Sequence, residues 1–110
     1  KNWSLIYNDK RSASIAPAYD FVSTIPYIAD KNAALKVSRS KNFADFTMDE
    51  LSHLAAKARL PEKLVLDTAE ETVSRFHEIW QKEKNNLALS SGVIEKIGQH
   101  LDTLPIATTK

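Results

Sequence analysis

Residues 1–28 read KNWSLIYNDKRSASIAPAYDFVSTIPYI, and the rest of the chain is organised around this stretch. Residues 3–7 favour a strand, because β-branched or aromatic side chains occupy three of the five positions. Residues 8–12 are a polar cluster typical of a turn, and residues 13–16 return as a second short strand. Pro17 ends that strand, because it has no N–H for a ladder. The stretch therefore predicts a β-hairpin.

Two polar residues, Asn2 and Asp20, flank the outer ends of this hairpin. A hairpin brings its outer ends together, so the two side chains are able to face one ligand. The alternative is that Asn2 is a turn residue and that Asp20 is a helix N-cap, opening a single helical turn over residues 21–25.

Two segments of this region resemble the catalytic segment of HipA-type kinases, the serine/threonine kinase toxins of bacterial toxin–antitoxin pairs. Residues 1–4, KNWS, resemble the end of the catalytic loop of that family. Residues 16–20, APAYD, resemble its metal-binding segment, which takes the place of DFG in ordinary protein kinases. The likeness over residues 1–28 is specific in type, order and spacing, whereas residues 41–104 have a general likeness to the helical C-terminal lobe of the family.

The resemblance implies phosphoryl transfer that depends on ATP and Mg²⁺. In the implied metal- and cofactor-binding site, Asp20 would hold Mg²⁺ and Asn2 would complete the set of ligands. Phosphoryl transfer depends mostly on positioning and charge neutralisation, and Mg²⁺ prefers hard oxygen ligands. In kinases an Asp carboxylate and the amide oxygen of a catalytic-loop Asn share this role.

Several parts of a kinase do not occur in the sequence. The kinase loop reads H-R-D-x-x-x-x-N, so the base Asp is expected five positions before Asn2, upstream of Lys1. No Gly-rich phosphate loop and no V-A-I-K lysine is present. We therefore expect the chain to be the C-terminal piece of a larger kinase, cut within its catalytic loop. Its 110 residues alone are expected to carry no catalytic base and to be inactive.

The composition is that of one modest globular domain, with 43% hydrophobic residues and a net charge of +1. The 15 basic and 14 acidic residues suggest no general nucleic-acid surface, so direct binding of nucleic acid is not expected. The absence of cysteine excludes disulfides and Cys-based zinc sites. No apolar run approaches the ~20 residues of a membrane span, and a cytoplasmic protein without membrane contact is expected.

Two amphipathic helices are predicted after the hairpin region. The first covers residues 43–59, with Thr47 as N-cap and Glu50 three residues later, which is the pattern of a capping box. Pro61 separates it from a long helix over residues 62–85, whose apolar residues recur at spacings of three and four and should lie in the core. This stripe consists of Val65, Ala69, Val73, Phe76 and Trp80.

A third helix opens at Ser90 or Ser91, because serine is a preferred N-cap. Its apolar face consists of Ile94, Ile97, Leu101 and Leu104. Pro105 is expected to end this helix, and residues 106–110 are expected to form a frayed tail.

The predicted fold class is mainly α, with an N-terminal β-hairpin followed by an antiparallel three-helix bundle. By resemblance, this arrangement is the C-terminal part of a kinase-like C-lobe. Residues 1–42 would form the metal-binding hairpin and the connecting segment of the kinase core. Residues 43–110 would form a helical C-terminal subdomain, and the two parts would make one continuous folding unit.

Two further sets of residues have a composition that could suit a binding site. Residues 29–42 are the most basic part of the chain, and a short apolar pulse within them fits a strand or an edge segment. This segment either contacts phosphate, a substrate protein or nucleic acid, or forms a solvated loop. His53, His77 and His100 belong to three different helices and have no metal-binding spacing, so we interpret them as surface or packing residues.

The resemblance implies that the intact protein is a serine/threonine protein kinase similar to the HipA toxin of type II toxin–antitoxin systems, which is associated with growth arrest and persistence. Its partners would be a DNA-binding antitoxin and a protein substrate, since members of the family act on aminoacyl-tRNA synthetases. The alternatives are a non-catalytic helical protein–protein interaction module and an inactive kinase-like protein. An Asp five positions before Asn2, with a lysine-bearing strand further upstream, would favour the active kinase.

Overall fold

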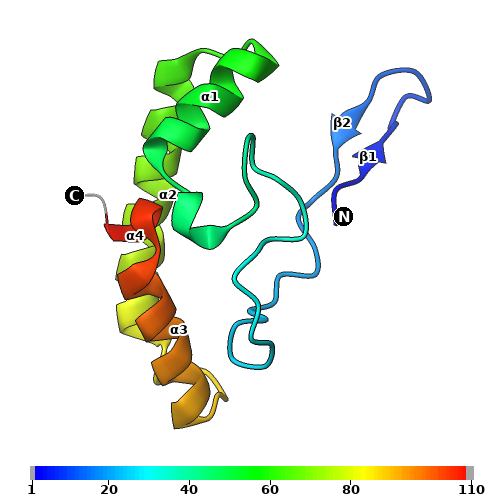
Figure 1. Cartoon of the computed structure of the whole chain (residues 1–110). Helices are drawn as coiled ribbons and strands as arrows, with labels where there is room; N and C mark the ends of the chain where they lie inside the picture. Colours follow the sequence, from blue (N-terminus) through cyan, green and yellow to red (C-terminus); the bar gives the residue numbers. More distant parts are fainter. Residues whose placement is uncertain (1, 109–110) are drawn as a thin grey trace.

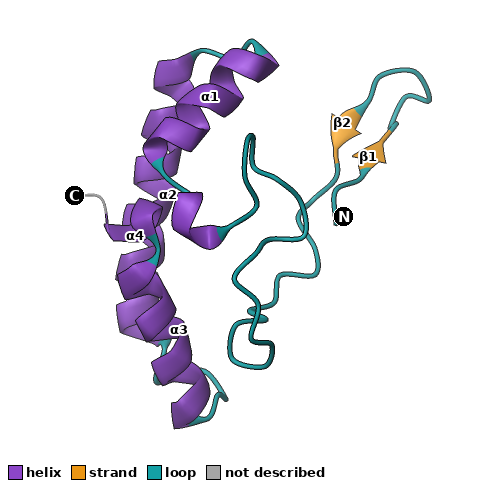
Figure 2. Cartoon of the chain, in the orientation of Figure 1, coloured by secondary structure: helices purple, strands orange, loops and turns teal. Residues whose placement is uncertain are grey.

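The computed structural model describes residues 2–108, and the regular structure of these residues consists of four α-helices, one short 3-10 helix and a two-stranded hairpin. Figure 1 shows the helices gathered in one elongated body, with the hairpin projecting away beyond an irregular segment. The Cα radius of gyration is 15.9 Å, above the roughly 13 Å of a compact domain of this length. The elements in chain order are β1 (Leu5–Ile6), β2 (Ser14–Ile15), the 3-10 helix η1 (Phe43–Asp45), α1 (Met48–Ala58), α2 (Glu62–Glu83), α3 (Ser91–Thr103) and α4 (Pro105–Thr108). The predicted class, mainly α with an N-terminal hairpin, is confirmed (Figure 2).

The hairpin is present with short strands. β1 and β2 pair antiparallel over two residues each, with Leu5 opposite Ile15. Asp9 holds the turn, because its Oδ1 accepts from the backbone N–H groups of Arg11 at 2.9 Å and Ser12 at 2.6 Å. Asp side chains favour turns through such bonds to the backbone two residues further on. Because each strand has only two residues, further bonds beyond the strands are needed to hold the outer ends of the hairpin together.

Residues 21–42 cross from the hairpin to the helices without forming a helix or a strand (Figure 2). Asn32 and Asn42 form an isolated antiparallel bridge, so the predicted edge segment is reduced to a single pairing. The alternative of a helical turn capped by Asp20 is wrong. Asp20 has a φ of 57°, whereas an N-cap residue lies in the β region, and residues 21–25 form no helix.

The start of α1 differs from the prediction in two ways. The three residues of η1 form a separate 3-10 helix, so the helix predicted from Phe43 begins only at Met48. Thr47 is the N-cap, as predicted, because its Oγ1 accepts from the N–H of Glu50 at 3.2 Å. The other half of the capping box is wrong, since the Glu50 carboxylate accepts from the backbone N–H groups of residues 38–40 instead. A tertiary contact has replaced the local one.

α2 is the longest helix, and α1 packs against it after the break at Pro61. Arg59 ends α1 in the left-handed region, with a φ of 56°, where a glycine is more usual. Trp80 is buried, as predicted. The predicted burial of Phe76 is wrong, because this ring is 48% exposed and stacks on Trp80 with the ring centroids 6.3 Å apart. The neighbouring helices leave Phe76 at two apolar cavities of about 480 and 580 Å³.

Residues 106–108 belong to a helix, so the prediction of a frayed tail is wrong for them. Pro105 begins α4, a position that suits proline because the first N–H groups of a helix have no intrahelical partner. Ile106 is only 5% exposed, and its backbone N–H donates to the carbonyl oxygen of Phe46 at 3.0 Å. Residues 109–110, also predicted to fray, lie outside the described residues.

α2 runs the length of the helical body, with α1 beside its first half and α3 beside its second half (Figure 1). Ser90 is the N-cap of α3, accepting from the N–H of Val93 at 3.4 Å, which decides between the two predicted caps. Few apolar side chains are buried in the described part of the chain: Leu51, Ala55, Trp80 and Ile106. Within residues 2–108, none of the helices combines the length and the apolar character that a membrane span requires.

Candidate metal site at the base of the hairpin

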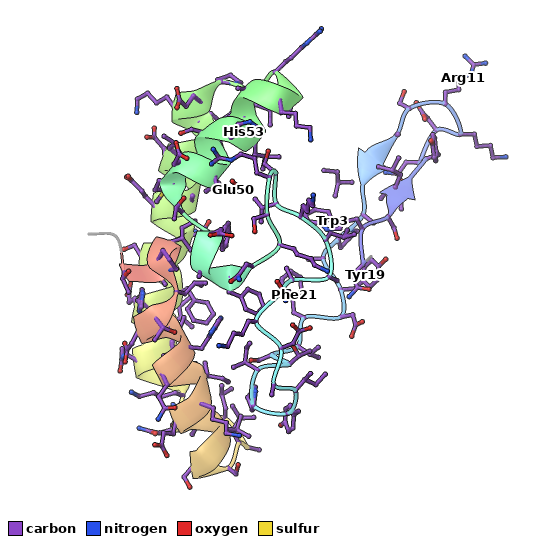
Figure 3. The ribbon with its side chains drawn as sticks, viewed as in Figure 1. Trp3, Arg11, Tyr19, Phe21, Glu50 and His53 are labelled. Atoms are coloured by element: carbon purple, nitrogen blue, oxygen red, sulfur yellow. The ribbon has the colours of Figure 1, made fainter. Side chains whose placement is uncertain are left out.

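Asn2 and Asp20 lie in direct contact at the base of the hairpin. The Asn2 Nδ2 donates to the Asp20 Oδ2 at 3.1 Å and lies 3.5 Å from the Asp20 carbonyl oxygen. The two residues are 18 positions apart, and both strands lie between them, so the pairing of β1 with β2 brings them together. Figure 3 shows Trp3, Tyr19 and Phe21 at this end of the hairpin. The residue that opens the resemblance, Lys1, lies outside the described residues.

The backbone at both site residues is left-handed, with a φ of 58° at Asn2 and 57° at Asp20. Non-glycine residues rarely adopt this region, and Asn and Asp tolerate it better than most. Such conformations persist where surrounding contacts determine them, and they cluster at functional sites. The residue types at these two positions are therefore suited both to the unusual backbone and to the supply of oxygen ligands.

The contact also determines how the Asn2 amide is oriented. An amide NH₂ group only donates and an ionised carboxylate only accepts, so the Nδ2 of Asn2 must face the Oδ2 of Asp20. The Asn2 Oδ1 and the Asp20 Oδ1 take part in no hydrogen bond with the described residues. An amide oxygen and a carboxylate oxygen of two residues in contact are therefore without a partner among the described residues.

A cavity of about 280 Å³ lies at this end of the hairpin. Its lining includes Asn2, Asp20 and the aromatic side chains of Trp3, Tyr19 and Phe21. Trp3 and Phe21 are 80% and 85% exposed, so both rings stand almost entirely in solvent. The cavity is open enough for a ligand larger than an ion to reach the two free oxygens.

A hydrogen bond between Ser4 and Tyr19 lies beside the Asn2–Asp20 contact, and the residue pattern did not predict it. The Ser4 Oγ and the Tyr19 hydroxyl are 2.7 Å apart. The backbone N–H of Ala16 donates to the Ser4 carbonyl oxygen at 2.8 Å, which continues the ladder past the strands. The available signal was proximity in the sequence, because Tyr19 precedes Asp20 and Ser4 follows Asn2 by two positions.

The chemistry of the two free oxygens fits Mg²⁺. This ion is usually bound by one or two protein groups and completes its octahedral shell with phosphate oxygens and water. Asn2 and Asp20 offer one amide oxygen and one carboxylate oxygen, and both residues are exposed, so further ligands can reach them. Within residues 2–108 no group of three or more His, Cys, Asp or Glu side chains could hold a metal ion. Phosphate oxygens and water would have to complete the shell of an ion held by these two oxygens.

The three histidines lie on α1, α2 and α3, and each contacts a segment that is distant in the sequence. His53 Nδ1 is 2.7 Å from the Ser38 Oγ, and His77 Nε2 is 2.9 Å from a backbone carbonyl of α4. The His100 ring packs edge-on against Phe43, with the ring centroids 5.1 Å apart. These contacts agree with the interpretation of the histidines as surface or packing residues.

In the basic segment of residues 29–42, the arginine is used within the fold. Arg39 pairs with Asp49 at 2.6 Å and with Glu50 at 2.8 Å. The three lysines of the segment are exposed. Of the two readings of this segment, the structure favours the solvated loop, because its one guanidinium group is already neutralised by two carboxylates.

Comparison with known proteins gives two matches to this chain. The model of a family described as the HipA-like C-terminal domain matches residues 1–80. A curated relative from Sinorhizobium fredii, named "Putative kinase Y4dM", is 53% identical over 107 residues, which cover 96% of this chain and 26% of the relative. The chain therefore spans about a quarter of the length of that relative. No solved structure matches the chain.

Proposed function

Because this chain belongs to the family of HipA-like C-terminal domains, we propose that it supplies the metal-binding part of a serine/threonine protein kinase that depends on ATP and Mg²⁺. The observation that carries the proposal is the contact between Asn2 and Asp20, which leaves two free oxygens at one exposed place. A relative that is 53% identical bears the name of a kinase, which supports the same class of reaction.

Each site residue has a distinct task in this proposal. When bound, Mg²⁺ neutralises negative charge on the phosphates of the nucleotide. Asp20 would hold the ion through its free Oδ1, and Asn2 would hold it through its amide Oδ1. The bond from the Asn2 Nδ2 orients the Asp20 carboxylate, because it occupies one carboxylate oxygen and leaves the other for the ion.

The remaining kinase machinery would come from a longer polypeptide. The base Asp, the phosphate-binding loop and the ATP-binding lysine have no counterpart in this sequence, and the matched part makes up 26% of the relative. By resemblance to HipA, the longer polypeptide would be a growth-arresting toxin of a type II toxin–antitoxin system and would act in the cytoplasm. Its partners would be a DNA-binding antitoxin and a protein substrate such as an aminoacyl-tRNA synthetase.

The experiment that tests this function is the Asp20→Asn substitution in the full polypeptide that carries this sequence. We expect phosphoryl transfer from ATP to a protein substrate to be abolished, because the variant lacks one negative ligand for the ion. The melting temperature should not change, since Asp20 is exposed. Asp102→Asn on α3 is the matched control, an exposed carboxylate far from the hairpin. Retained turnover in Asp20→Asn would contradict the metal role.

A non-catalytic interaction module is the second candidate, and the surface of α2 favours it. Phe76 and Ile79, three positions apart on this helix, are 48% and 59% exposed, and adjoining exposed apolar side chains can mark a protein contact; Leu64, nearer the start of the helix, is 61% exposed. If this candidate is correct, the full polypeptide shows no Mg²⁺-dependent phosphoryl transfer, and Leu64→Ser or Ile79→Ser weakens the binding of a protein partner. If the kinase is correct, both variants retain the transfer reaction.

A further inference from the structure

We propose that Ser4 and Tyr19 are positioning residues of the metal site. The hydrogen bond between their hydroxyl groups, which we name the hydroxyl clasp, holds the segments that carry Asn2 and Asp20 beside each other. This inference rests on the proposed function. The clasp joins two segments that are 15 positions apart, across a distance of 2.7 Å between the two oxygens.

The clasp acts where the backbone ladder stops. The backbone bond nearest to the site runs from the Ala16 N–H to the Ser4 carbonyl oxygen, at 2.8 Å. The next hydrogen-bonded pair of the ladder would be Ala18 with Asn2, and no backbone hydrogen bond joins these two residues in the described structure. Beyond this point, among the described residues, only bonds made by side chains join the two outer ends of the hairpin. These bonds are the clasp and the contact between Asn2 and Asp20.

The site needs this second bond because both of its ligands have an unusual backbone. The left-handed conformations of Asn2 and Asp20 require support from their surroundings. The Asn2–Asp20 contact and the clasp are both exposed hydrogen bonds between side chains, and each contributes little alone, so the support of the site comes from the two bonds together. Tyr19 directly precedes Asp20, and consecutive Cα atoms are about 3.8 Å apart. A hydrogen bond that holds the Tyr19 side chain therefore also restricts where Asp20 lies.

The residue types make the inference testable with small changes. Phenylalanine has the ring of tyrosine without the hydroxyl, so Tyr19→Phe removes the clasp and keeps the shape of the cavity wall. Ser4→Ala removes the other hydroxyl. Tyr7 on the same hairpin is a matched control, because it is 54% exposed, close to the 45% of Tyr19, and its hydroxyl makes no hydrogen bond in the described structure.

The test is a titration of Mn²⁺ alone into the 110-residue chain, followed by ¹H–¹⁵N NMR. Mn²⁺ takes the oxygen ligands that Mg²⁺ takes, and as a paramagnetic ion it broadens the amide signals of Asn2 and Asp20 when it binds beside them. Tyr19→Phe and Ser4→Ala should each raise the Mn²⁺ concentration for half-loss of these signals by about threefold to tenfold, the range for one lost hydrogen bond. The double variant should resemble the single variants, because both remove the same bond.

Two further readouts separate positioning from a general loss of the hairpin. Before Mn²⁺ is added, the amide signals of Ser14 and Ile15, which pair with Ile6 and Leu5, should keep their positions in the clasp variants, because the strand pairing remains. Tyr7→Phe should leave the Mn²⁺ response unchanged. An unchanged response in Tyr19→Phe and Ser4→Ala overturns the inference, as does an equal loss in Tyr7→Phe or a displacement of the strand signals in both clasp variants.

Asp20→Asn tests the proposed function in the same titration. If this variant loses the Mn²⁺ response while the clasp variants keep it, the metal role stands and the clasp is wrong. If Asp20→Asn retains the full response, the metal role is wrong, and the inference about the clasp is overturned with it.

Discussion

Arg39 donates from its Nε to the Oε2 of Glu50 at 2.8 Å, although Glu50 is among the most deeply buried residues of the chain, with 2% of its surface exposed. The Oε1 of the same carboxylate accepts from the backbone N–H groups of Ser38 at 3.0 Å and Ser40 at 3.1 Å, and also from that of Arg39. Figure 3 shows Glu50 on α1, facing the irregular segment. This carboxylate therefore anchors the connecting segment to the helical body.

Stability should depend on pH through Glu50. Burial alone raises the pKa of this carboxyl, but the side chain of Arg39 and the three backbone N–H groups outweigh burial and lower its pKa from 4.5 to about 2. A group whose pKa is lower in the folded state contributes its stability above the unfolded pKa. The contribution of Glu50 is therefore complete above pH 4.5 and is lost as the pH falls toward about 2. Thermal melting across this range should show the decline.

Glu50→Gln should melt at a lower temperature than the wild type near neutral pH. Both carboxylate oxygens of Glu50 accept hydrogen bonds, whereas an amide has only one oxygen, so its NH₂ group would face either the Arg39 Nε or the backbone N–H groups of residues 38–40. Its melting temperature should also fall less steeply than that of the wild type between pH 4.5 and about 2. Asp49→Asn is the control, since it removes the exposed partner of Arg39 and leaves Glu50 in place. An equally steep decline in Glu50→Gln would show that other carboxyl groups cause it.

Trp80→Ala should lower the free energy of unfolding by roughly 3–5 kcal/mol, the range for truncating a buried large aromatic side chain. Trp80 is 9% exposed, whereas its stacking partner Phe76 is 48% exposed. Phe76→Ala should therefore have a clearly smaller effect than Trp80→Ala. Urea unfolding followed by circular dichroism measures both values. A change below about 1 kcal/mol for Trp80→Ala would place this face of α2 in solvent.

Ile106→Ala should lower the free energy of unfolding by about 2–5 kcal/mol, because α4 buries this side chain and its backbone donates to Phe46. Thr108→Ala, at an exposed position of the same helix, should change it by no more than about 0.5 kcal/mol. Both values come from the same urea experiment. Equal small effects of the two substitutions would mean that the last helix does not dock in solution.

The 110-residue chain alone should melt cooperatively, at a midpoint that does not respond to millimolar Mg-ATP. A ligand raises the midpoint only if it binds the folded state, and recognition of adenine and phosphate in kinases uses a lysine and a glycine-rich loop that this sequence lacks. Asn2 and Asp20 alone leave Mg²⁺ mostly hydrated, so binding should be weak. Circular dichroism with and without Mg-ATP is the measurement. A clear rise of the midpoint would locate a nucleotide site within these residues.

Much of the local structure is determined by the sequence itself. The hairpin, the caps at Thr47 and Ser90 and the break at Pro61 all depend on residues within a few positions of one another, so their residue types predict them. The proximity of Asn2 and Asp20 follows from the same local rule, because a hairpin brings its own ends together. Their role as metal ligands remains a prediction.

Only the tertiary structure decided what lies between segments that are distant in the sequence. The Glu50 carboxylate could accept from its own helix start or from the loop eleven residues away at Arg39, and the loop with its guanidinium group outcompetes the local cap. Phe76 has the spacing of a core residue, but it lies beside a cavity between α2 and α3 and is 48% exposed. The hydroxyl clasp depends on where the chain runs after Pro17. A hydrogen-bonding group or an apolar ring takes its partner from whichever segment packs beside it, and residue spacing along one element contains no information about that segment.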